Sequence, residues 1–340
     1  MPDRSPEPSL RVAVLLPCYN EEAAIGRTVA AFRAALPGAT VYVYDNNSRD
    51  RTVAVAEAAG AVVRRERMQG KGHVVRRMFA DIDADVYVMA DGDETYEAAA
   101  APRMVATLVD EQLDMVVGAR RDEVEAAYRR GHRFGNAMLT GLLAWLFGRS
   151  FSDILSGYRV FSRRFVKSFP VLSGGFEIET EISVHALELK MPVAEQVTAY
   201  GARPEGSASK LSTYRDGFRI LGLILTLFRI ERPVLFFGAI AGALLLLAVG
   251  LSIPLIITYL DTGLVPRVPT AILATGLSIV AVLSFFAGLI LDTVVRGRRE
   301  VRRLAYLSHP APARTHGASA LKSAAAGAML PASTEGSFPL

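Results

Sequence analysis

Two stretches near the C-terminal end contain no charged residue, and they constrain the fold of this chain more than any other feature. Residues 233–260 run for 28 positions without Asp, Glu, Lys or Arg, and residues 268–291 run for another 24. A helix needs about 20 apolar residues to cross the hydrocarbon core of a bilayer. The alternative, a buried helix of a soluble protein, is rarely so long and so free of charge. We therefore predict two transmembrane helices.

Basic residues flank the predicted spans on the outer side of the pair. Arg229 and Arg232 precede the first span, and five arginines follow the second between residues 296 and 303. The loop between the spans, residues 261–267, has one acidic and one basic residue. Because positively charged flanks stay in the cytoplasm, we expect both ends of the pair and the large N-terminal part of the chain there. The prediction is a multi-pass protein of the plasma (inner) membrane.

Shorter segments flank the central part of the chain. Residues 1–10 are polar and lack the apolar core of a signal peptide, so we predict a disordered leader. Residues 307–340 are rich in Ala, Ser, Pro and Gly, which predicts a disordered tail. Residues 214–232 repeat apolar side chains at helical spacing directly before the first span. We favour an amphipathic helix on the membrane surface there over a core helix.

Residues 11–213 alternate between short apolar runs typical of buried strands and longer patterns typical of helices. Such alternation predicts an α/β fold with a mostly parallel sheet flanked by helices. Ligands of these sheets bind beyond the carboxyl ends of the strands. The predicted strands are residues 11–16, 41–44, 61–63, 86–90 and 115–118.

Asp91-Gly92-Asp93 directly follows the predicted strand at residues 86–90. Mg²⁺ and Mn²⁺ prefer carboxylate oxygens and are often shared with substrate phosphates. Asp and Gly are also ordinary turn residues, so the motif alone is weak. Two further polar clusters, residues 17–21 and 45–48, also follow predicted strands and should share the same edge of the sheet. This convergence favours a metal–diphosphate site.

Other features exclude several classes of function. The single cysteine, Cys18, allows no internal disulfide, which fits a reducing compartment. The net charge of +4 is modest, and no basic stripe with interleaved aromatic residues indicates a nucleic-acid partner. His73, His132 and His185 show no metal-ligand spacing. The oligomeric state stays open, a homo-oligomer included.

Five segments form an ordered set of motifs: Leu-Pro-Cys-Tyr-Asn-Glu-Glu (16–22), Asp-Asn-Asn-Ser-Arg-Asp-Arg-Thr (45–52), Gly-Lys-Gly (70–72), Ala-Asp-Gly-Asp (90–93) and Asp-Ile-Leu-Ser-Gly-Tyr-Arg-Val-Phe-Ser-Arg (153–163). Together they resemble family 2 glycosyltransferases of the GT-A fold, a Rossmann-like α/β fold, and they occur in the order typical of that family. A domain of this kind followed by two spans is similar to polyprenyl-phosphate glycosyltransferases, relatives of dolichyl-phosphate mannose synthase. The only tryptophan, Trp145, is not part of the Gln-x-x-Arg-Trp motif of processive synthases, which argues against a polymerase.

The resemblance implies a donor site for a nucleotide-diphosphate sugar and a divalent cation. Residues 17–21 would frame the base and ribose, and Asp45 would accept a hydrogen bond from one of them. Asp91 and Asp93 would bind Mg²⁺ or Mn²⁺, which stabilises the charge on the departing diphosphate. The full set implied to bind the nucleotide sugar is Pro17, Tyr19, Glu21, Asp45, Lys71, Asp91 and Gly92.

The resemblance also implies an acceptor site. It implies two catalytic residues, Asp93 and Asp153. Asp153 aligns with the usual catalytic base, but a lipid phosphate is already anionic and needs orientation and charge screening more than deprotonation. Asp153 as a true base and Asp153 as a positioning residue that holds an arginine therefore both remain open. Arginine grips phosphate through two parallel hydrogen bonds. The expected ligands of the acceptor phosphate are Arg120, Arg133, Arg159, Arg203 and Lys210.

The sequence therefore predicts a membrane-anchored inverting hexosyltransferase that moves a sugar from a nucleotide-diphosphate sugar to a polyprenyl phosphate at the bilayer. One alternative is transfer to a hydroxyl group of a glycolipid or glycan, for which Asp153 would be a true base. Another alternative, from a different class, is an inactive membrane scaffold that binds nucleotide. Intact Asp91 and Asp93 argue against the scaffold.

Overall fold

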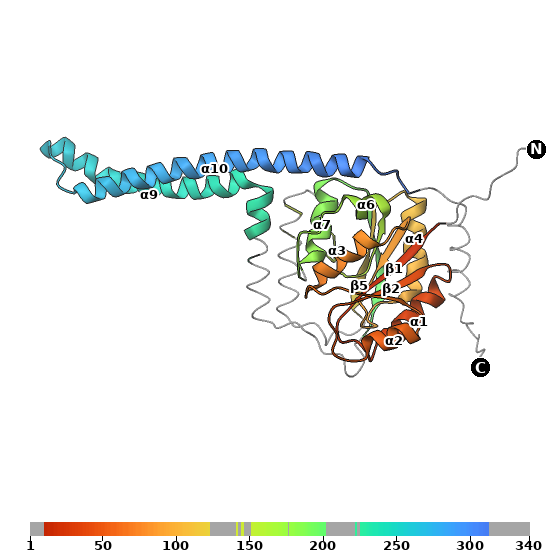
Figure 1. Ribbon diagram of the computed structural model, residues 1–340. Helices are drawn as coiled ribbons and strands as arrows, with labels where there is room; N and C mark the ends of the chain where they lie inside the picture. The colour runs from red at the N-terminus through yellow and green to blue at the C-terminus, as the bar shows by residue number, and fades with distance from the viewer. Residues whose placement is uncertain are drawn as a thin grey trace, which may run out of the picture. The chain divides into compact units, whose positions relative to one another are not determined.

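The computed structural model describes residues 10–122, 141, 144–145, 151–175, 177–201, 222 and 225–312 (Figure 1). The chain forms two compact units. The first comprises Met1–Thr213 together with Arg302–Leu340, and the second comprises Tyr214–Val301. The first unit contains the sheet, and the second contains two long helices.

A seven-stranded sheet with the order β3-β2-β1-β4-β6-β5-β7 forms the centre of the first unit. Strands β1, β2, β3 and β4 pair in parallel, as do β5 and β7. Only β6 runs against its neighbours, β4 and β5. The strands are β1 (Val12–Cys18), β2 (Thr40–Asp45), β3 (Val62–Arg65), β4 (Val86–Met89), β5 (Met115–Asp122), β6 (Arg159–Ser162) and β7 (Val193–Tyr200).

Helices cover both faces of this sheet. Successive side chains of a strand point to opposite faces, so residues of one strand pack against helices on both sides. Val86 and Val88 of β4 pack into a cluster with α1 and α4, whereas the ring of Tyr87 between them contacts Phe79 of α3. The helices of this unit are α1 (Ile25–Ala35), α2 (Thr52–Ala58), α3 (Lys71–Asp81), the 3₁₀ turn η1 (Ala98–Ala100), α4 (Ala101–Asp110), α6 (Arg163–Ser168) and α7 (Ile178–Glu188) (Figure 1).

The mostly parallel sheet with flanking helices is confirmed, and two details differ from the sequence-based expectation. Strand β1 continues past residue 16 through Pro17 to Cys18. Pairing of β1 with β4 ends at Leu15, so the missing N–H of Pro17 interrupts no bond on that side. Strands β6 and β7 were not predicted; β7 has exposed positions along its length, as an edge strand does, and lacks a continuous apolar run.

His185 of α7 is buried against the rings of Phe165 and Phe169 on one side of the sheet. Its Nε2 lies 3.3 Å from Ser168 Oγ, and its Nδ1 has no hydrogen-bond partner in the described part of the chain. Burial, assisted by the positive charge of Arg302, lowers the pKa of His185 to about 3. The imidazole is therefore neutral in the folded protein at physiological pH.

Acidification is expected to destabilise the first unit through His185. The unfolded chain takes up a proton below the ordinary pKa of 6.5, whereas the folded protein stays unprotonated at this position until about pH 3. Stability is fully retained above pH 6.5 and falls as the pH drops from 6.5 towards 3, by about 2 kcal/mol at pH 5. Thermal unfolding measured across this range should lose that part of its pH dependence in His185→Leu. An unchanged slope would contradict the assignment.

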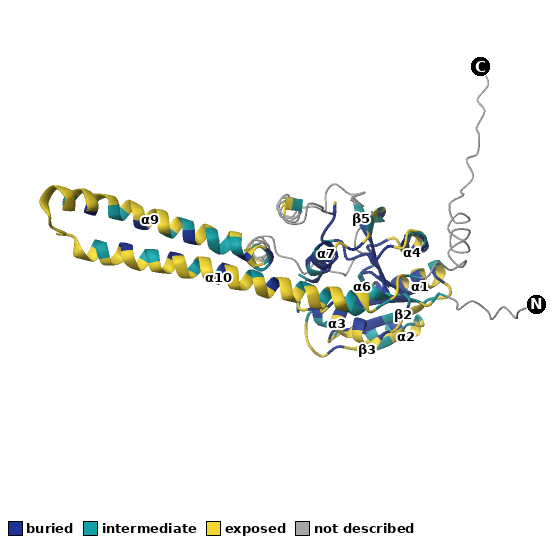
Figure 2. Cartoon of the chain, turned by 90° about the horizontal axis from the view of Figure 1, so that it is seen from above, coloured by how far each residue is buried: buried dark blue, intermediate teal, exposed yellow. Residues whose placement is uncertain are grey.

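The second unit contains helices α9 (Pro233–Thr262) and α10 (Val268–Leu307), both long and apolar enough to cross a membrane. Most of their apolar side chains are exposed (Figure 2). A core helix of a soluble protein would be mostly buried, whereas only 11% and 17% of their most apolar windows are buried. Apart from Pro233 at the start of α9, their buried positions recur every seven residues and are mainly small, as in closely packed membrane helices. They are Ala241, Ala248 and Leu255 in α9 and Ala274, Ala281, Gly288 and Val295 in α10.

Helix α10 continues well beyond the predicted span, and its end belongs to the first unit. Arg302 forms an ion pair with Glu188 of α7 (2.5 Å). The Tyr306 hydroxyl donates to Asp114 Oδ2 (2.9 Å), a carboxylate with no solvent exposure. Of the predicted tail at residues 307–340 the structure describes only the part up to 312, and most of the predicted amphipathic helix at 214–232 lies outside the described residues.

Candidate active site

Three turns that follow the parallel strands β1, β2 and β4 lie at one edge of the sheet. The Glu21 N–H, after β1, donates to Thr52 Oγ1, after β2 (2.8 Å). The turn after β4 is tied to helix α1, because the Gly92 carbonyl oxygen accepts from Thr28 Oγ1 (3.3 Å). These contacts bring together the polar segments that the sequence placed at a common edge.

The residues expected to frame a nucleotide are divided between β1 and β2. Pro17 lies within β1, and Tyr19 and Glu21 follow it as half-buried residues. Asp45 ends β2 and is only 3% exposed. Its carboxylate accepts the Ser48 N–H at 3.2 and 3.4 Å, so in this structure Asp45 stabilises its own turn.

Lys71 is the first residue of helix α3, and its ammonium lies between two carboxylates. Lys71 Nζ is 2.5 Å from Asp91 Oδ1 and 2.5 Å from Glu179 Oε1. Burial by itself lowers the pKa of Lys71, but the charges and hydrogen bonds of Asp91 and Glu179 outweigh it and raise the pKa above its usual value. The ammonium is therefore charged at physiological pH, and Lys71 is part of the same cluster as the acidic motif.

Asp91 and Asp93 are the carboxylates that could hold a metal ion. Asp93 is buried, and its Oδ1 accepts from Thr95 Oγ1 (2.6 Å) and from the Thr95 N–H (3.3 Å). In the described residues no group of three or more His, Cys, Asp or Glu side chains could hold a metal by itself. Mg²⁺ in particular is commonly bound through one or two carboxylates and completed by substrate phosphates. The donor set therefore fits an ion shared with a diphosphate.

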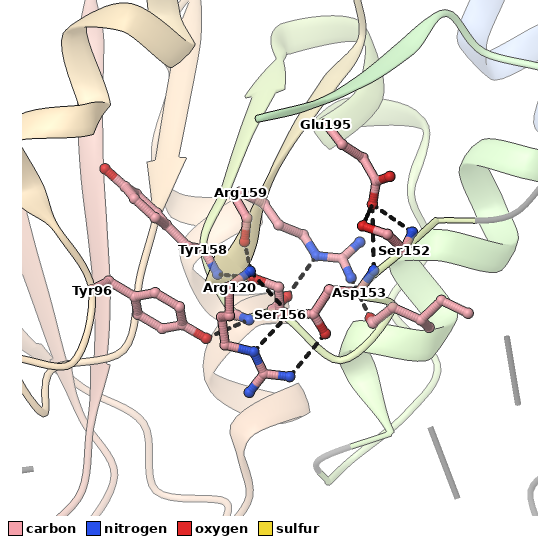
Figure 3. Close-up of polar contacts among 11 residues, drawn as sticks. Tyr96, Arg120, Ser152, Asp153, Ser156, Tyr158, Arg159 and Glu195 are labelled. Atoms are coloured by element: carbon pink, nitrogen blue, oxygen red, sulfur yellow. Dashed lines mark hydrogen bonds and ion pairs between the residues drawn. The ribbon is translucent and has the colours of Figure 1, made fainter. Parts of the chain in front are cut away.

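Asp153 is held by Arg120 of β5 (Figure 3). The guanidinium donates from Nε to Asp153 Oδ2 (2.6 Å) and from Nη2 to Oδ1 (2.8 Å). The Arg120 N–H also approaches Oδ2 (3.3 Å), and the guanidinium lies 5.3 Å from the Tyr200 ring centroid. Two parallel charge-assisted hydrogen bonds fix the direction of the carboxylate.

Glu195 of β7 holds the backbone on the other side of Asp153. Its Oε1 accepts from the Ser152 N–H (2.8 Å), from Ser152 Oγ (3.2 Å) and from the Asp153 N–H (3.4 Å) (Figure 3). Asp153 is thus fixed through both its backbone and its side chain, by residues of β7 and β5.

The segment that follows the tight turn at residues 153–156 connects Asp153 with the Lys71 cluster. The Gly157 N–H donates to the Tyr96 hydroxyl (2.8 Å), and Ser156 Oγ donates to the Gly118 carbonyl oxygen (2.6 Å) (Figure 3). A Cβ added at Gly157 would lie 2.8 Å from Asp91 Oδ2 and 3.2 Å from Lys71 Nζ. The backbone at Gly157 therefore runs directly against the Asp91–Lys71 pair, and a side chain there would displace the ends of both.

Arg159 is placed differently from the phosphate ligand that the sequence suggested. It has no solvent exposure, and burial lowers its pKa to about 10. Its guanidinium donates to the Ser156 carbonyl oxygen (2.9 Å), to Ser183 Oγ (2.9 Å) and to the Ile154 carbonyl oxygen (2.5 Å). These are the contacts of a residue that shapes the 154–156 turn from inside the core, so we remove Arg159 from the acceptor group.

The other expected acceptor ligands divide into two groups. Arg120 lies at the site, but Asp153 accepts from its Nε and Nη2, the two nitrogens that would form paired hydrogen bonds to a phosphate. Arg133, Arg203 and Lys210 lie outside the described residues.

Sequence reasoning missed Glu179 and Glu195. Both contact partners distant in the chain, and short motifs identify only local neighbours. One signal was available for Glu179, which is the middle residue of Glu-Ile-Glu-Thr-Glu at residues 177–181. Residues two apart do not share a helix face. Glu179 is therefore expected to face a different partner from Glu181.

Comparisons with known proteins found relatives of this chain in sequence and in fold. A family model described as "Glycosyl transferase family 2" matches residues 13–169. The chain is 36% identical over 250 residues to the glycosyltransferase AglJ of Haloferax volcanii, covering 73% of this chain and 81% of that protein. It is 32% identical over 152 residues to the dolichyl-phosphate hexose transferase of the same organism, covering 45% of this chain and 66% of that one.

A similar fold occurs in a solved structure of glucosyl-3-phosphoglycerate synthase from Mycobacterium tuberculosis, in complex with Mn²⁺, uridine diphosphate and phosphoglyceric acid. The TM-score is 0.52 and the sequence identity is 23%, and the match covers 65% of this chain and 78% of that one. At this identity the similarity concerns the fold alone.

Proposed function

This chain belongs to glycosyl transferase family 2 and is a glycosyltransferase with a GT-A type fold, and from this premise we propose the reaction that it catalyses. We infer that it is an inverting hexosyltransferase of the plasma membrane. Its donor is a nucleotide-diphosphate sugar, and its acceptor is the phosphate of a polyprenyl lipid such as undecaprenyl phosphate. The product is a polyprenyl-phosphate sugar, released together with the nucleoside diphosphate.

One observation carries the choice of acceptor: the chain of the catalytic unit continues into two helices, α9 and α10, that are long and apolar enough to cross a membrane. A protein anchored in this way works at the bilayer surface, where a lipid phosphate is presented. The relative named dolichyl-phosphate hexose transferase supports the same acceptor class. The relative named AglJ supports sugar transfer without specifying the acceptor.

The donor half of the proposed site is the edge formed by the turns after β1, β2 and β4. Residues 17–21 and Asp45 would bind the nucleoside, and Asp91 and Asp93 would hold Mg²⁺ or Mn²⁺ against the diphosphate. A divalent cation there supplies charge screening for the departing diphosphate. The Mn²⁺ in the structurally similar synthase supports this choice of metal. Lys71 adds a fixed positive charge beside Asp91.

The acceptor half of the proposed site needs no general base. The phosphate oxygen of the lipid already carries negative charge; it attacks the anomeric carbon from the face opposite the diphosphate, and the bond from that carbon to the diphosphate oxygen breaks. Asp153 accepts two hydrogen bonds from Arg120, so its geometry fits the positioning of Arg120 and the nearby turn better than the removal of a proton. Arg120 would lie beside the incoming phosphate. Because Asp153 compensates the charge of Arg120, the charge that neutralises the phosphate would come from Arg133, Arg203 and Lys210.

The test is sugar transfer by membranes that contain the full chain, supplied with undecaprenyl phosphate and a panel of radiolabelled nucleotide sugars. We expect label in the lipid extract that mild acid releases as free sugar, because a glycosyl phosphate is acid-labile. Acid-stable labelled lipid would indicate a hydroxyl acceptor instead. Binding of donors with no transfer from any of them would support an inactive scaffold.

Asp153→Asn separates the two acceptor chemistries in the same assay. With a phosphate acceptor, neutralising Asp153 weakens its hold on Arg120, and we expect kcat to fall by about tenfold or less. Loss of a general base typically costs about 10²–10⁴-fold. A loss of that larger size with an unchanged KM for the acceptor would favour the hydroxyl reaction. Glu177→Gln, an acid-to-amide change at the N-cap of α7, serves as the matched control.

A further inference from the structure

The ammonium of Lys71 is held by two acidic residues from distant parts of the chain. Asp91 follows β4 and Glu179 lies in the first turn of α7, and each has a carboxylate oxygen 2.5 Å from Lys71 Nζ. The Lys71 and Glu179 side chains are buried, at 9% and 7% exposure, whereas that of Asp91 is 31% exposed. Asp91, the residue expected to hold the metal, is therefore the most accessible of the three. The Lys71 ammonium contacts Asp91 and is also held by the buried carboxylate of Glu179.

The backbone around Lys71 is packed so closely that this arrangement is built into the fold. A Cβ at Gly70 or Gly72 would collide with the backbone carbonyl oxygen of Gly174 or Ser173. That loop is fixed by α7 in turn, because Glu181 accepts the Leu172 N–H (2.8 Å) and the Ser173 N–H (2.7 Å). The first turn of α7 thus holds both the loop beneath the glycines and, through Glu179, the lysine between them.

We propose that Glu179 is a positioning residue of the donor site, which holds Lys71 against Asp91 and so sets how strongly the acidic motif attracts a divalent cation. This proposal rests on the donor site described above. Lys71, Asp91 and Glu179 carry one positive and two negative charges. The Lys71 ammonium and a metal ion would both be attracted to the negative charge of Asp91. Glu179 compensates part of the positive charge of Lys71, so more of the Asp91 charge is left for the metal. The cluster would keep binding of the metal alone weak, so that stable binding awaits the diphosphate.

Opposite effects of two substitutions follow from these charges. Glu179→Gln keeps the size of the side chain and removes one negative charge, leaving Lys71 to compensate Asp91 fully, so the motif attracts a divalent cation less. Lys71→Gln removes the positive charge and leaves both carboxylates uncompensated, so the attraction increases. The double substitution restores the original net charge of the cluster. Purely structural damage would instead weaken metal binding in all three variants.

The experiment measures Mn²⁺ binding directly, from the electron paramagnetic resonance signal of free Mn²⁺ titrated against the purified full chain in detergent. We expect binding to weaken by about 5–10-fold in Glu179→Gln and to tighten by about 5–10-fold in Lys71→Gln. The double variant should lie within about twofold of the unsubstituted protein. Glu177→Gln, the same charge change two residues earlier, should shift binding by less than about twofold.

Two outcomes would overturn the proposal. One is a shift of the same sign in Glu179→Gln and Lys71→Gln, and the other is Mn²⁺ affinity unchanged in both. If the repulsion between Asp91 and Glu179 prevents Lys71→Gln from folding, as judged by circular dichroism, Glu179→Gln and the double variant decide the matter: the first must weaken binding and the second must restore it. Lipid-linked product with unchanged Mn²⁺ affinities would refute this inference alone. The expected shifts without sugar transfer would refute the proposed function alone.

Discussion

Sugar transfer is expected to fall by about 10²–10³-fold when Asp93 is replaced by asparagine, the largest effect on activity that we foresee. Asparagine keeps a side-chain oxygen that can accept from Thr95 Oγ1 and the Thr95 N–H, so the turn after β4 should persist. What is lost is the negative charge that would hold a divalent cation against the diphosphate. Removal of one preorganised electrostatic contact to a transition state typically costs on the order of 3–4 kcal/mol. The measurement is initial rate against Mn²⁺ concentration.

The comparison with Asp93→Ala shows whether charge or local structure is responsible. Alanine removes the charge and the contacts to Thr95 together, so equal losses in both variants would assign the effect to charge. Asp83 provides a matched control, because it precedes the same strand at its opposite end and pairs with Arg163 near the surface (2.8 Å). Asp83→Asn should change the rate by less than about twofold. Wild-type transfer in Asp93→Asn would refute the metal assignment.

Replacing Arg159 by methionine is expected to have the largest effect on stability. The substitution leaves the carbonyl oxygens of Ile154 and Ser156 without their buried donor, as well as Ser183 Oγ. Unsatisfied buried groups cost about 1–3 kcal/mol each, and several of these groups are affected at once. We expect the free energy of unfolding to fall by roughly 3–5 kcal/mol. Thermal unfolding in detergent, followed by circular dichroism, should show a midpoint lower by roughly 10 °C.

Arg103 offers the control for this second prediction. It also donates to a backbone carbonyl oxygen, that of Val197 (3.1 Å), but at an exposed position. Arg103→Met should therefore lower the free energy of unfolding by less than about 1 kcal/mol. A normally folded Arg159→Met enzyme with a raised KM for the lipid phosphate would contradict the placement in the core and return Arg159 to the acceptor group.

The edge of the sheet proposed to bind the donor could be predicted from the sequence because each of its turns is recognisable from neighbouring residues. Each polar turn directly follows an apolar strand, and parallel strands place their carboxyl ends at one edge, so strand order alone brings residues 17–21, 45–48 and 91–93 together. Helix α3 could be predicted for the same reason, since Gly70 precedes it and its apolar residues recur at helical spacing.

The acceptor side could be predicted only in part, because its contacts join residues far apart in the chain. An arginine in a motif expected to bind phosphate can face either a ligand or the core. The sequence does not distinguish the two, and the Arg159 side chain faces the core. Arg120 and Asp153 were both expected at the site, yet their mutual pairing depends on how β5 and the 151–158 segment pack. Glu179 and Glu195 come from elements that follow all the motifs.

The contacts at the end of α10 affect how the enzyme can be divided for study. Asp114 receives hydrogen bonds from Arg164 and from Tyr306, and Glu188 is paired with Arg302. A shortened chain that stops before α9 would expose these buried acids and remove the Tyr306 ring that lies beneath the Arg164 guanidinium. The first unit is thus not one continuous stretch of sequence. The chain leaves it at Thr213, forms Tyr214–Val301, and re-enters it at Arg302. A water-soluble version would need those last helical residues joined back to it.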